Sequence, residues 1–265
     1  MSKRVLITGA ASGIGAATAK ELRSRGAQVV GIDLQPGDGD LDLIACDVRD
    51  QAAVERAVGE AIERLGGLDV LINNAGIGEA QSAGDAPDER ALAILDVNLI
   101  APWRVTSAAL AALRESRGRV VNVASGLAHL AIPLVPAYCM SKRGLTAYSD
   151  ALRLEHGDAI TVTTVYPGYI KTPIHANSEA DGFALEGMVP EEKLEAVALT
   201  MARAALGRPV RDLATTRRGG FQYLLLRATP RGLMDRLTLA VLRREARRGR
   251  FKGSALAREL VQRLS

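Results

Sequence analysis

Residues 5–15 read VLITGAASGIG: three apolar residues, a turn that contains Gly9, Gly13 and Gly15, and the start of a helical pattern. A strand, a glycine-rich turn and a helix start form the phosphate-binding beginning of a dinucleotide-binding fold. Gly9 permits the tight turn, Gly13 lets the backbone approach a pyrophosphate, and Gly15 lets helix and strand pack closely. A glycine triplet alone is weak evidence, but its place between a strand and a helix favours this interpretation over a plain turn.

The second predicted strand, residues 28–32, ends at Asp33. An acid at this position accepts hydrogen bonds from both ribose hydroxyls of adenosine and repels a 2′-phosphate. Leu34 follows it, and Ser12 rather than a basic residue precedes Gly13. We therefore predict NAD rather than NADP as the coenzyme, in preference to an Asp33 that is only a solvated strand end.

Strands alternate with helices through most of the chain that follows. A polar loop at 35–42 precedes a third strand at 43–48, closed by Asp47 and Val48, where a carboxylate can meet the adenine amino group. A helix at 51–65 and a strand at 68–72 come next, and the strand ends in the turn NNAG at 73–76. Further strands are predicted at 119–123 and 161–165. This alternation predicts an α/β fold of the Rossmann type, with a doubly wound parallel sheet of about seven strands.

Two polar side chains mark the expected site at the carboxyl edge of this sheet. Residues 88–113 are predicted to be helical, although Asn98 is a poor helix former and Pro102 cannot donate to its carbonyl. We expect an opened helix there, whose Asn98 side chain and carbonyl can hold a water. Ser125 lies just past the strand at 119–123, and ligands of open α/β sheets bind beyond the carboxyl ends of the strands.

Tyr138 and Lys142 lie four residues apart at the start of a predicted helix that runs to Leu154. Residues four apart on a helix lie one above the other, so the two side chains should project together. A phenol titrates near ~10, and a neighbouring ammonium stabilises the phenolate and lowers that pKa. The pair therefore predicts a device for moving a proton on and off a substrate oxygen, although the same spacing also occurs on solvated helix faces.

Together these motifs resemble the classical short-chain dehydrogenase/reductase family over residues 3–175. TGAASGIG at 8–15, NNAG at 73–76, Asn98, Ser125, YCMSK at 138–142 and PGYIKT at 167–172 carry the likeness. The resemblance implies that Tyr138 is the general acid/base, that Lys142 lowers its pKa and binds the nicotinamide ribose, that Ser125 holds the substrate oxygen, and that Asn98 anchors a relay water. It also implies a cofactor site lined by Gly9, Ser12, Gly13, Ile14, Gly15, Asp33, Asp47, Val48, Asn74, Ala75, Gly76, Tyr138, Lys142, Pro167, Gly168, Ile170 and Thr172.

The activity implied by the resemblance is that of an NAD(H)-dependent oxidoreductase that interconverts a secondary alcohol and a ketone. Hydride chemistry belongs to the nicotinamide, while the protein positions the substrate and moves the proton. The apolar loop at 127–135 and the hydrophobic tail favour an apolar substrate. The tail resembles the longer tails of some hydroxysteroid and retinol-type members of the family, which implies a steroid-, retinol- or aromatic-alcohol-like substrate. Two alternatives remain open, a non-catalytic NAD-binding sensor on the same fold and an NADPH-dependent ketoreductase. The three histidines have no metal-ligand spacing, so no metal is expected.

Charge is divided unevenly along the chain, whose net charge is +4. Residues from Arg208 onward hold 15 of the 34 basic and 4 of the 30 acidic residues, a net of +11, which leaves a net of −7 for the rest. We expect a dinucleotide-binding and catalytic domain at 1–207. A basic, apolar extension at 208–265 would pack on it as a substrate lid, an oligomer contact or a membrane-surface contact.

The extension contains a predicted helix at 231–244 with Leu233, Met234, Leu237 and Val241 at helical spacing and arginines on the borders. It either packs on the enzyme or a second subunit, or lies on an anionic membrane surface. Its arginines alternate with leucine rather than with stacking aromatics, so no nucleic-acid partner is expected. The extension lacks the short closing strand common in tetrameric members of the family, and a homo-oligomer, dimeric or tetrameric, is expected.

The cysteine content and the N-terminus bear on the compartment. Cys46 and Cys139 are the only cysteines and lack CxxC spacing, which is typical of small buried residues in a reducing compartment. The N-terminus has no signal-peptide pattern, and no apolar run is long enough to span a bilayer. We expect a cytoplasmic protein, peripheral to the membrane if the extension binds lipid.

Overall fold

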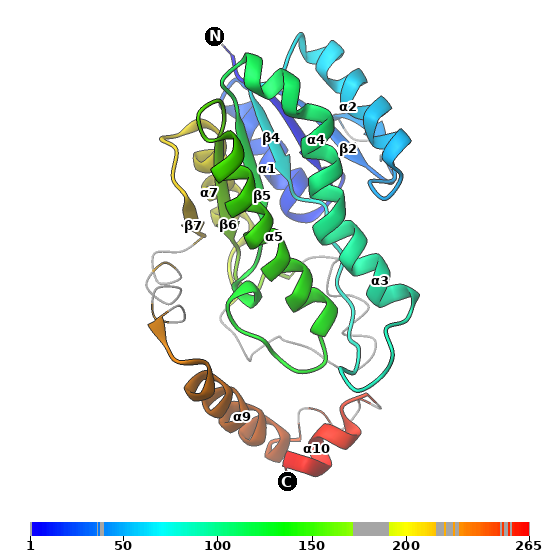
Figure 1. Cartoon of the computed structure of the whole chain (residues 1–265), viewed down its shortest axis with the longest axis vertical. Helices are drawn as coiled ribbons and strands as arrows, with labels where there is room; N and C mark the ends of the chain where they lie inside the picture. Colours follow the sequence, from blue (N-terminus) through cyan, green and yellow to red (C-terminus); the bar gives the residue numbers. More distant parts are fainter. Residues whose placement is uncertain are drawn as a thin grey trace.

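The computed structural model describes residues 2–35, 37, 40–171, 191–215, 220, 225, 228–249, 251, 254 and 256–264 (Figure 1). Its centre is a seven-stranded sheet in the order β3-β2-β1-β4-β5-β6-β7, in which every neighbouring pair is parallel. The predicted α/β, doubly wound sheet is confirmed. The strands are β1 Arg4–Thr8, β2 Gln28–Asp33, β3 Asp42–Ala45, β4 Val70–Asn73, β5 Arg119–Val123, β6 Thr161–Tyr166 and β7 Asp212–Ala214.

Helices cover both faces of the sheet and create two apolar cores. Successive side chains of a strand point to opposite faces, so Leu6 of β1 packs into one core while Val5 and Ile7 pack into the other. The core around Leu6 is closed by α2 Gln51–Leu65, α4 Ala101–Glu115 and α5 Pro136–His156. The core around Val5 is closed by α1 Gly13–Ser24 and α7 Leu194–Leu206, which pack against each other.

The third strand is shorter than predicted. It ends at Ala45, opposite Asp33, because β3 lies at the edge of the sheet and its only partner, β2, ends there. Asp47 and Val48 therefore lie beyond the strand rather than at its end, in a turn in which the Asp50 amide donates to the Asp47 carbonyl over 3.0 Å.

The predicted helix at 88–113 is divided into three segments. They are α3 Glu89–Leu95, the π-helix η1 Asp96–Ile100, and α4. Because Pro102 has no N–H to offer the Asn98 carbonyl, the chain widens, and the Ala101 amide bonds the Asp96 carbonyl five residues back. Single π turns within helices are frequent at functional sites, and the predicted opening of this helix is confirmed.

The sheet continues beyond residue 207. Contrary to the expectation that the extension lacks a short closing strand, β7 pairs with β6 in register Val165↔Leu213. The described part of the extension that follows contains α9 Arg231–Arg247 and α10 Arg258–Leu264, which lie together at one end of the molecule (Figure 1). Among the described residues, no helix combines the length and the hydropathy that a membrane span requires.

Candidate active site

The glycine-rich turn between β1 and α1 has the backbone that the sequence predicts. Gly9 adopts φ +66° and Gly13 adopts φ +52°, a region that favours glycine. A Cβ on Gly15 would lie 1.9 Å from the Gly9 carbonyl oxygen, so helix and turn approach as closely as glycine allows. Ser12 precedes the helix, and its side chain makes no capping hydrogen bond. The positive end of α1 thus fits a phosphate group.

Asp33 ties the end of β2 to this turn, because its carboxylate accepts a hydrogen bond from the Ala11 amide over 2.9 Å. Leu34 beside it is mostly exposed. Asp47 lies past the neighbouring strand and pairs with Arg49 over 2.6 Å. The hydrogen bonds from the Arg49 side chain hold the pKa of Asp47 below its ordinary value. Both acids thus lie at the carboxyl edge of the sheet.

The turn after β4 is fastened directly to the glycine-rich turn. The Thr8 hydroxyl accepts from the amides of Asn74 (3.1 Å) and Ala75 (3.0 Å), and the Asn74 side chain donates to the carbonyls of Thr8 and Gly9. A Cβ on Gly9 would meet the Ala75 Cα at 2.8 Å, and one on Gly76 would meet the Asn98 Oδ1 at 3.3 Å. These bonds fix the crevice where the strand order reverses between β1 and β4, the usual ligand-binding place in such sheets.

Asn98 is fully buried in the π-helix and joins two parts of the site. Its Oδ1 accepts from the Ile77 amide (2.8 Å), and its Nδ2 donates to the Ile77 carbonyl (2.9 Å) and the Ser141 hydroxyl (3.2 Å). Ser141 in turn donates to the Tyr138 carbonyl over 2.8 Å. The Asn98 side chain and carbonyl were both predicted to hold a water. The side chain is instead hydrogen-bonded to Ile77 and Ser141.

Tyr138, Lys142 and Ser125 come together as the sequence predicts. Tyr138 and Lys142 occupy the first turns of α5, and the Lys142 Nζ lies 5.7 Å from the centroid of the Tyr138 ring. This ammonium also donates to the Val123 carbonyl over 3.0 Å. Ser125 follows β5, accepts a hydrogen bond from the Leu127 amide, and hydrogen-bonds the Tyr138 side chain. Two hydroxyls and one ammonium thus share a space past the end of β5.

Burial controls the electrostatics of this group. It raises the pKa of Tyr138 to about 12, against the opposing effect of the Ser125 hydrogen bond, and lowers the pKa of Lys142 to about 8. Desolvation of the phenolate thus outweighs the favourable contacts in the protein alone, and the lowering of this pKa by Lys142 stays a prediction. At neutral pH the phenol keeps its proton and the ammonium keeps its charge.

The segment after β6 borders the same edge. The Gly126 amide donates to the Pro167 carbonyl over 3.2 Å, which holds this segment next to Ser125, and Ile170 is buried. A Cβ on Gly168 would meet the Glu192 carboxylate at 2.6 Å. Thr172, the last predicted cofactor residue, lies outside the described residues. Of the other predicted site residues, Asn98 lies in the π-helix, and the rest follow the carboxyl ends of strands or lie in the first turns of α1 and α5.

An apolar cluster that the sequence analysis did not single out borders Tyr138. Ala80 and three residues near Tyr138 (Leu134, Val135 and Cys139) form it with four residues of the extension (Leu242, Phe251, Ala257 and Leu264), and Tyr138 packs against it. The helical spacing of apolar residues in the extension predicted that one face of it is covered, but it could not predict which surface of the protein covers that face. Within the described part of the chain, no three His, Cys, Asp or Glu side chains gather as a metal site would require.

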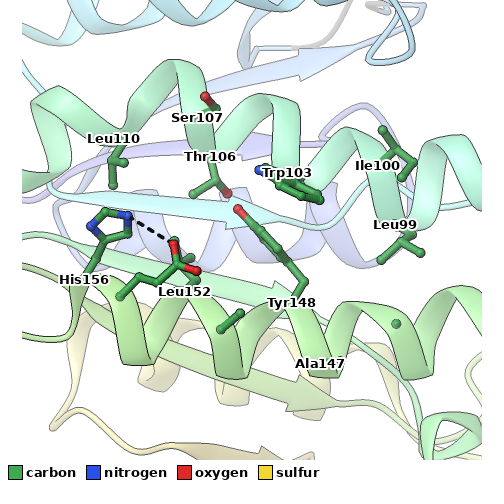
Figure 2. Close-up of a pocket in the computed structure, with 13 residues that line it drawn as sticks. Leu99, Ile100, Trp103, Thr106, Ser107, Leu110, Ala147, Tyr148, Leu152 and His156 are labelled. Carbon is green, nitrogen blue, oxygen red and sulfur yellow. Dashed lines mark ion pairs between the residues drawn. The ribbon is translucent and has the colours of Figure 1, made fainter.

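A second hollow lies away from these residues, between α4 and α5 (Figure 2). It has a volume of about 420 Å³ and is lined largely by apolar side chains of the two helices. The Trp103 and Tyr148 rings stack in it at 5.5 Å, and Trp103 is 60% exposed. Neither Tyr138 nor Lys142 lines it, so this groove is separate from the predicted chemistry.

The comparisons with known proteins agree with this geometry. The sequence model of the family described as short chain dehydrogenase matches residues 3–182. A Streptomyces coelicolor protein named "Putative ketoacyl reductase" is 32% identical over 79% of this chain and 85% of its own length. Ligand-free aldohexose dehydrogenase of Thermoplasma acidophilum superposes with a TM-score of 0.71 at 26% identity, covering 80% of this chain and 92% of that one. An alcohol dehydrogenase of Thermococcus sibiricus, in complex with 5-hydroxy-NADP, superposes with a TM-score of 0.70 at 23% identity over 81% and 96% of the chains.

Proposed function

The chain belongs to the short-chain dehydrogenase/reductase family of oxidoreductases, and on that basis we propose that it interconverts an apolar secondary alcohol and its ketone with NAD(H). One observation carries the proposal. Tyr138, hydrogen-bonded to Ser125 and packed near the Lys142 ammonium, lies half-buried at the same sheet edge as the glycine-rich turn. This arrangement offers a proton, a hydrogen-bond donor and a positive charge next to a nucleotide cradle.

Each residue then has a defined task. A bound nicotinamide would supply or accept the hydride. The glycine-rich turn and Asp33 would hold the coenzyme's pyrophosphate and adenosine ribose. Ser125 donates to the substrate oxygen, and the Tyr138 phenol, protonated because it is buried, gives its proton to that oxygen during ketone reduction. In alcohol oxidation Tyr138 takes the proton, and the Lys142 charge stabilises the phenolate that precedes this step.

The apolar character of the substrate follows from what borders Tyr138. The cluster of Leu134, Val135 and the extension residues around Leu242 is apolar, and the Tyr138 ring lies against it. An apolar alcohol would bury its hydrocarbon part there, while its oxygen reaches the two hydroxyls. Steroid and aromatic secondary alcohols meet this description.

The test of this proposal compares the wild type with Tyr138→Phe. NAD reduction is followed with a panel of steroid, aromatic and aliphatic secondary alcohols, and NADH oxidation with the matching ketones. We expect Tyr138→Phe to lower turnover by about 10²–10⁴-fold and to leave NAD binding intact. Tyr148→Phe, in the separate groove, is the matched control and should retain turnover. Near-normal activity of Tyr138→Phe would refute the mechanism, and NAD binding without turnover of any substrate would favour the sensor.

An NADPH-dependent ketoreductase is the second candidate. The name of the Streptomyces coelicolor relative favours ketone reduction and does not specify the coenzyme. The carboxylate of Asp33 and the exposed Leu34 support NAD instead, since neither offers a positive charge to a 2′-phosphate. Titration of the wild type with NADH and NADPH separates the two. Asp33→Ala combined with Leu34→Arg should weaken NADH and admit NADPH. Tighter NADPH binding by the wild type would overturn the NAD assignment.

We further propose that a second copy of the chain occupies the groove between α4 and α5. An exposed Trp103 beside an apolar hollow makes this surface self-complementary, because the ring of each copy can enter the hollow of the other. Contacts of this kind are typical of two-fold symmetric dimers.

A further inference from the structure

Helix α9 exposes a line of large apolar side chains on its outer face. Leu233, Leu237 and Val241 follow one another at four-residue spacing and are 49%, 52% and 48% exposed. Residues at this spacing lie one above the other on a helix. The side of α9 next to Val241 packs on the protein, since Leu242 and Glu245 are buried there and Met234 is half-buried. The sequence grouped Met234 with Leu233, Leu237 and Val241 as one apolar face, and in the structure Met234 is more buried than the other three.

Arginines accompany this apolar line. Arg236, Arg243 and Arg247 follow one another along its border, and Arg244 lies three residues beyond Val241 on the line itself. All four are exposed, and none forms an ion pair with another described residue. The acids of the helix do not add exposed negative charge to this line: Glu245, four residues beyond Val241, is buried and pairs with Arg248, and Asp235 is two residues from both Leu233 and Leu237, close to the far side of the helix.

We propose that this outer face of α9, formed by Leu233, Leu237, Val241 and the four arginines, docks on an anionic lipid bilayer. A helix that combines a line of large apolar side chains with uncompensated positive charge lies in the interface plane, its leucines among the acyl chains and its arginines at the headgroups. Each arginine near such a surface strengthens binding by about fivefold. The proposal concerns the surface of the protein and does not depend on the proposed reaction.

A second copy of the chain is a poorer occupant of the same face. In a two-fold contact the same face of both copies forms the interface. The four arginines of one copy would therefore lie against a face that carries the same four charges. Like charges at close range oppose association, and α9 offers no exposed acid on this face to offset them. An anionic bilayer supplies both the opposite charge and the apolar phase.

Helix α9 lies between the proposed bilayer and the apolar cluster at Tyr138. Its inner side contributes Leu242 to the apolar cluster that borders Tyr138. A bilayer on the outer side would therefore lie across one helix from the cluster, at the end of the molecule where α9 and α10 are found (Figure 1). Residues far from this end should have no part in binding.

Flotation of the full-length protein with lipid vesicles tests the proposal. We expect binding to vesicles of phosphatidylcholine with about one third phosphatidylglycerol at low salt, its loss near about 0.5 M salt, and none to phosphatidylcholine alone. Arg236→Gln with Arg243→Gln should weaken binding by about 25-fold. Leu233→Asn with Leu237→Asn should weaken it by at least about tenfold. All four positions are exposed, so thermal unfolding should stay unchanged.

Matched controls carry the same changes on other surfaces. Arg56→Gln with Arg114→Gln removes two exposed, unpaired charges from α2 and α4, and Leu154→Asn removes an exposed leucine from α5. These variants should bind as the wild type does. Absence of binding to anionic vesicles at low salt would overturn the proposal, and so would an equal loss in the controls. A lipid-free dimer that Leu233→Asn with Leu237→Asn dissociates would assign the face to a second copy instead.

Discussion

Lys142→Met removes the one ammonium in the buried group and tests how strongly burial acts there. The pKa of Lys142 falls to about 8 in the folded protein from an ordinary value of 10.5, because the side chain is desolvated. Its ammonium donates a hydrogen bond to the neutral Val123 carbonyl. The charged form is therefore disfavoured in the folded state. This pKa difference means that burial of the charged ammonium lowers the free energy of unfolding by about 3 kcal/mol at pH values where both the folded and the unfolded chain hold the proton.

The sign of the effect fixes the pH window. Below pH 8 both the folded and the unfolded chain hold the proton, so the cost is constant. Between pH 8 and 10.5 the unfolded chain still holds a proton that the folded chain has released, so the free energy of unfolding rises with pH. Relative to Lys142→Met, which has no such proton, the wild type should gain about 2 kcal/mol between about pH 7.5 and about pH 9.5.

Urea unfolding of both proteins across this range, with stability compared at each pH, measures the gain. Groups common to both, such as the Cys46 thiol whose pKa burial raises to about 11, cancel in the difference. Lys20→Met, on the exposed side of α1, is the matched control and should stay parallel to the wild type. A difference between wild type and Lys142→Met that does not change with pH would refute the reasoning.

Three further predictions concern the turn, the extension and the groove. Gly15→Ala places a Cβ 1.9 Å from the Gly9 carbonyl and should destabilise the fold by at least about 2 kcal/mol and weaken NAD binding, whereas Gly59→Ala, with nothing within 4 Å, should be neutral or stabilising in thermal unfolding. Truncation after Arg227 should raise the KM for substrate more than the Kd for NAD, and equal effects would argue against a cover over the site. Trp103→Glu places a charge in the groove and should lower the mass found by sedimentation, while an unchanged mass would place any subunit contact elsewhere.

The fold was largely predictable because its signals are local. The apolar run before Gly9, the glycines and the end of β2 at Asp33 together specify a strand, a turn and a helix within a few residues. The end of β3 was not predictable in the same way. Its apolar pattern continues to Val48, but the hydrogen bonds that a strand needs stop where its partner β2 stops, and that register is set by residues outside β3.

The local effect of Pro102 was also predictable, and its consequence for Asn98 was only partly so. A proline without an N–H predicts a disturbed helix four residues earlier, which the π-helix confirms. The use of the Asn98 side chain depends on Ile77 and Ser141, which reach it from the turn after β4 and from α5. No pattern around Asn98 itself could reveal these partners, since the fold alone brings them together.

The electrostatics of Tyr138 illustrate the same limit and give the extension a role in the chemistry. Four-residue spacing correctly placed Lys142 beside Tyr138, and on an exposed helix that ammonium would lower the pKa of the phenol. Here the side chain is half-buried and desolvation dominates its pKa, and the apolar cluster against its ring includes Leu242 and Phe251 from the extension as well as Leu134 from the neighbouring loop. A segment about a hundred residues further along the chain thus helps to exclude water from the proposed proton donor, and the side of α9 proposed to bind lipid lies at the same end of the molecule.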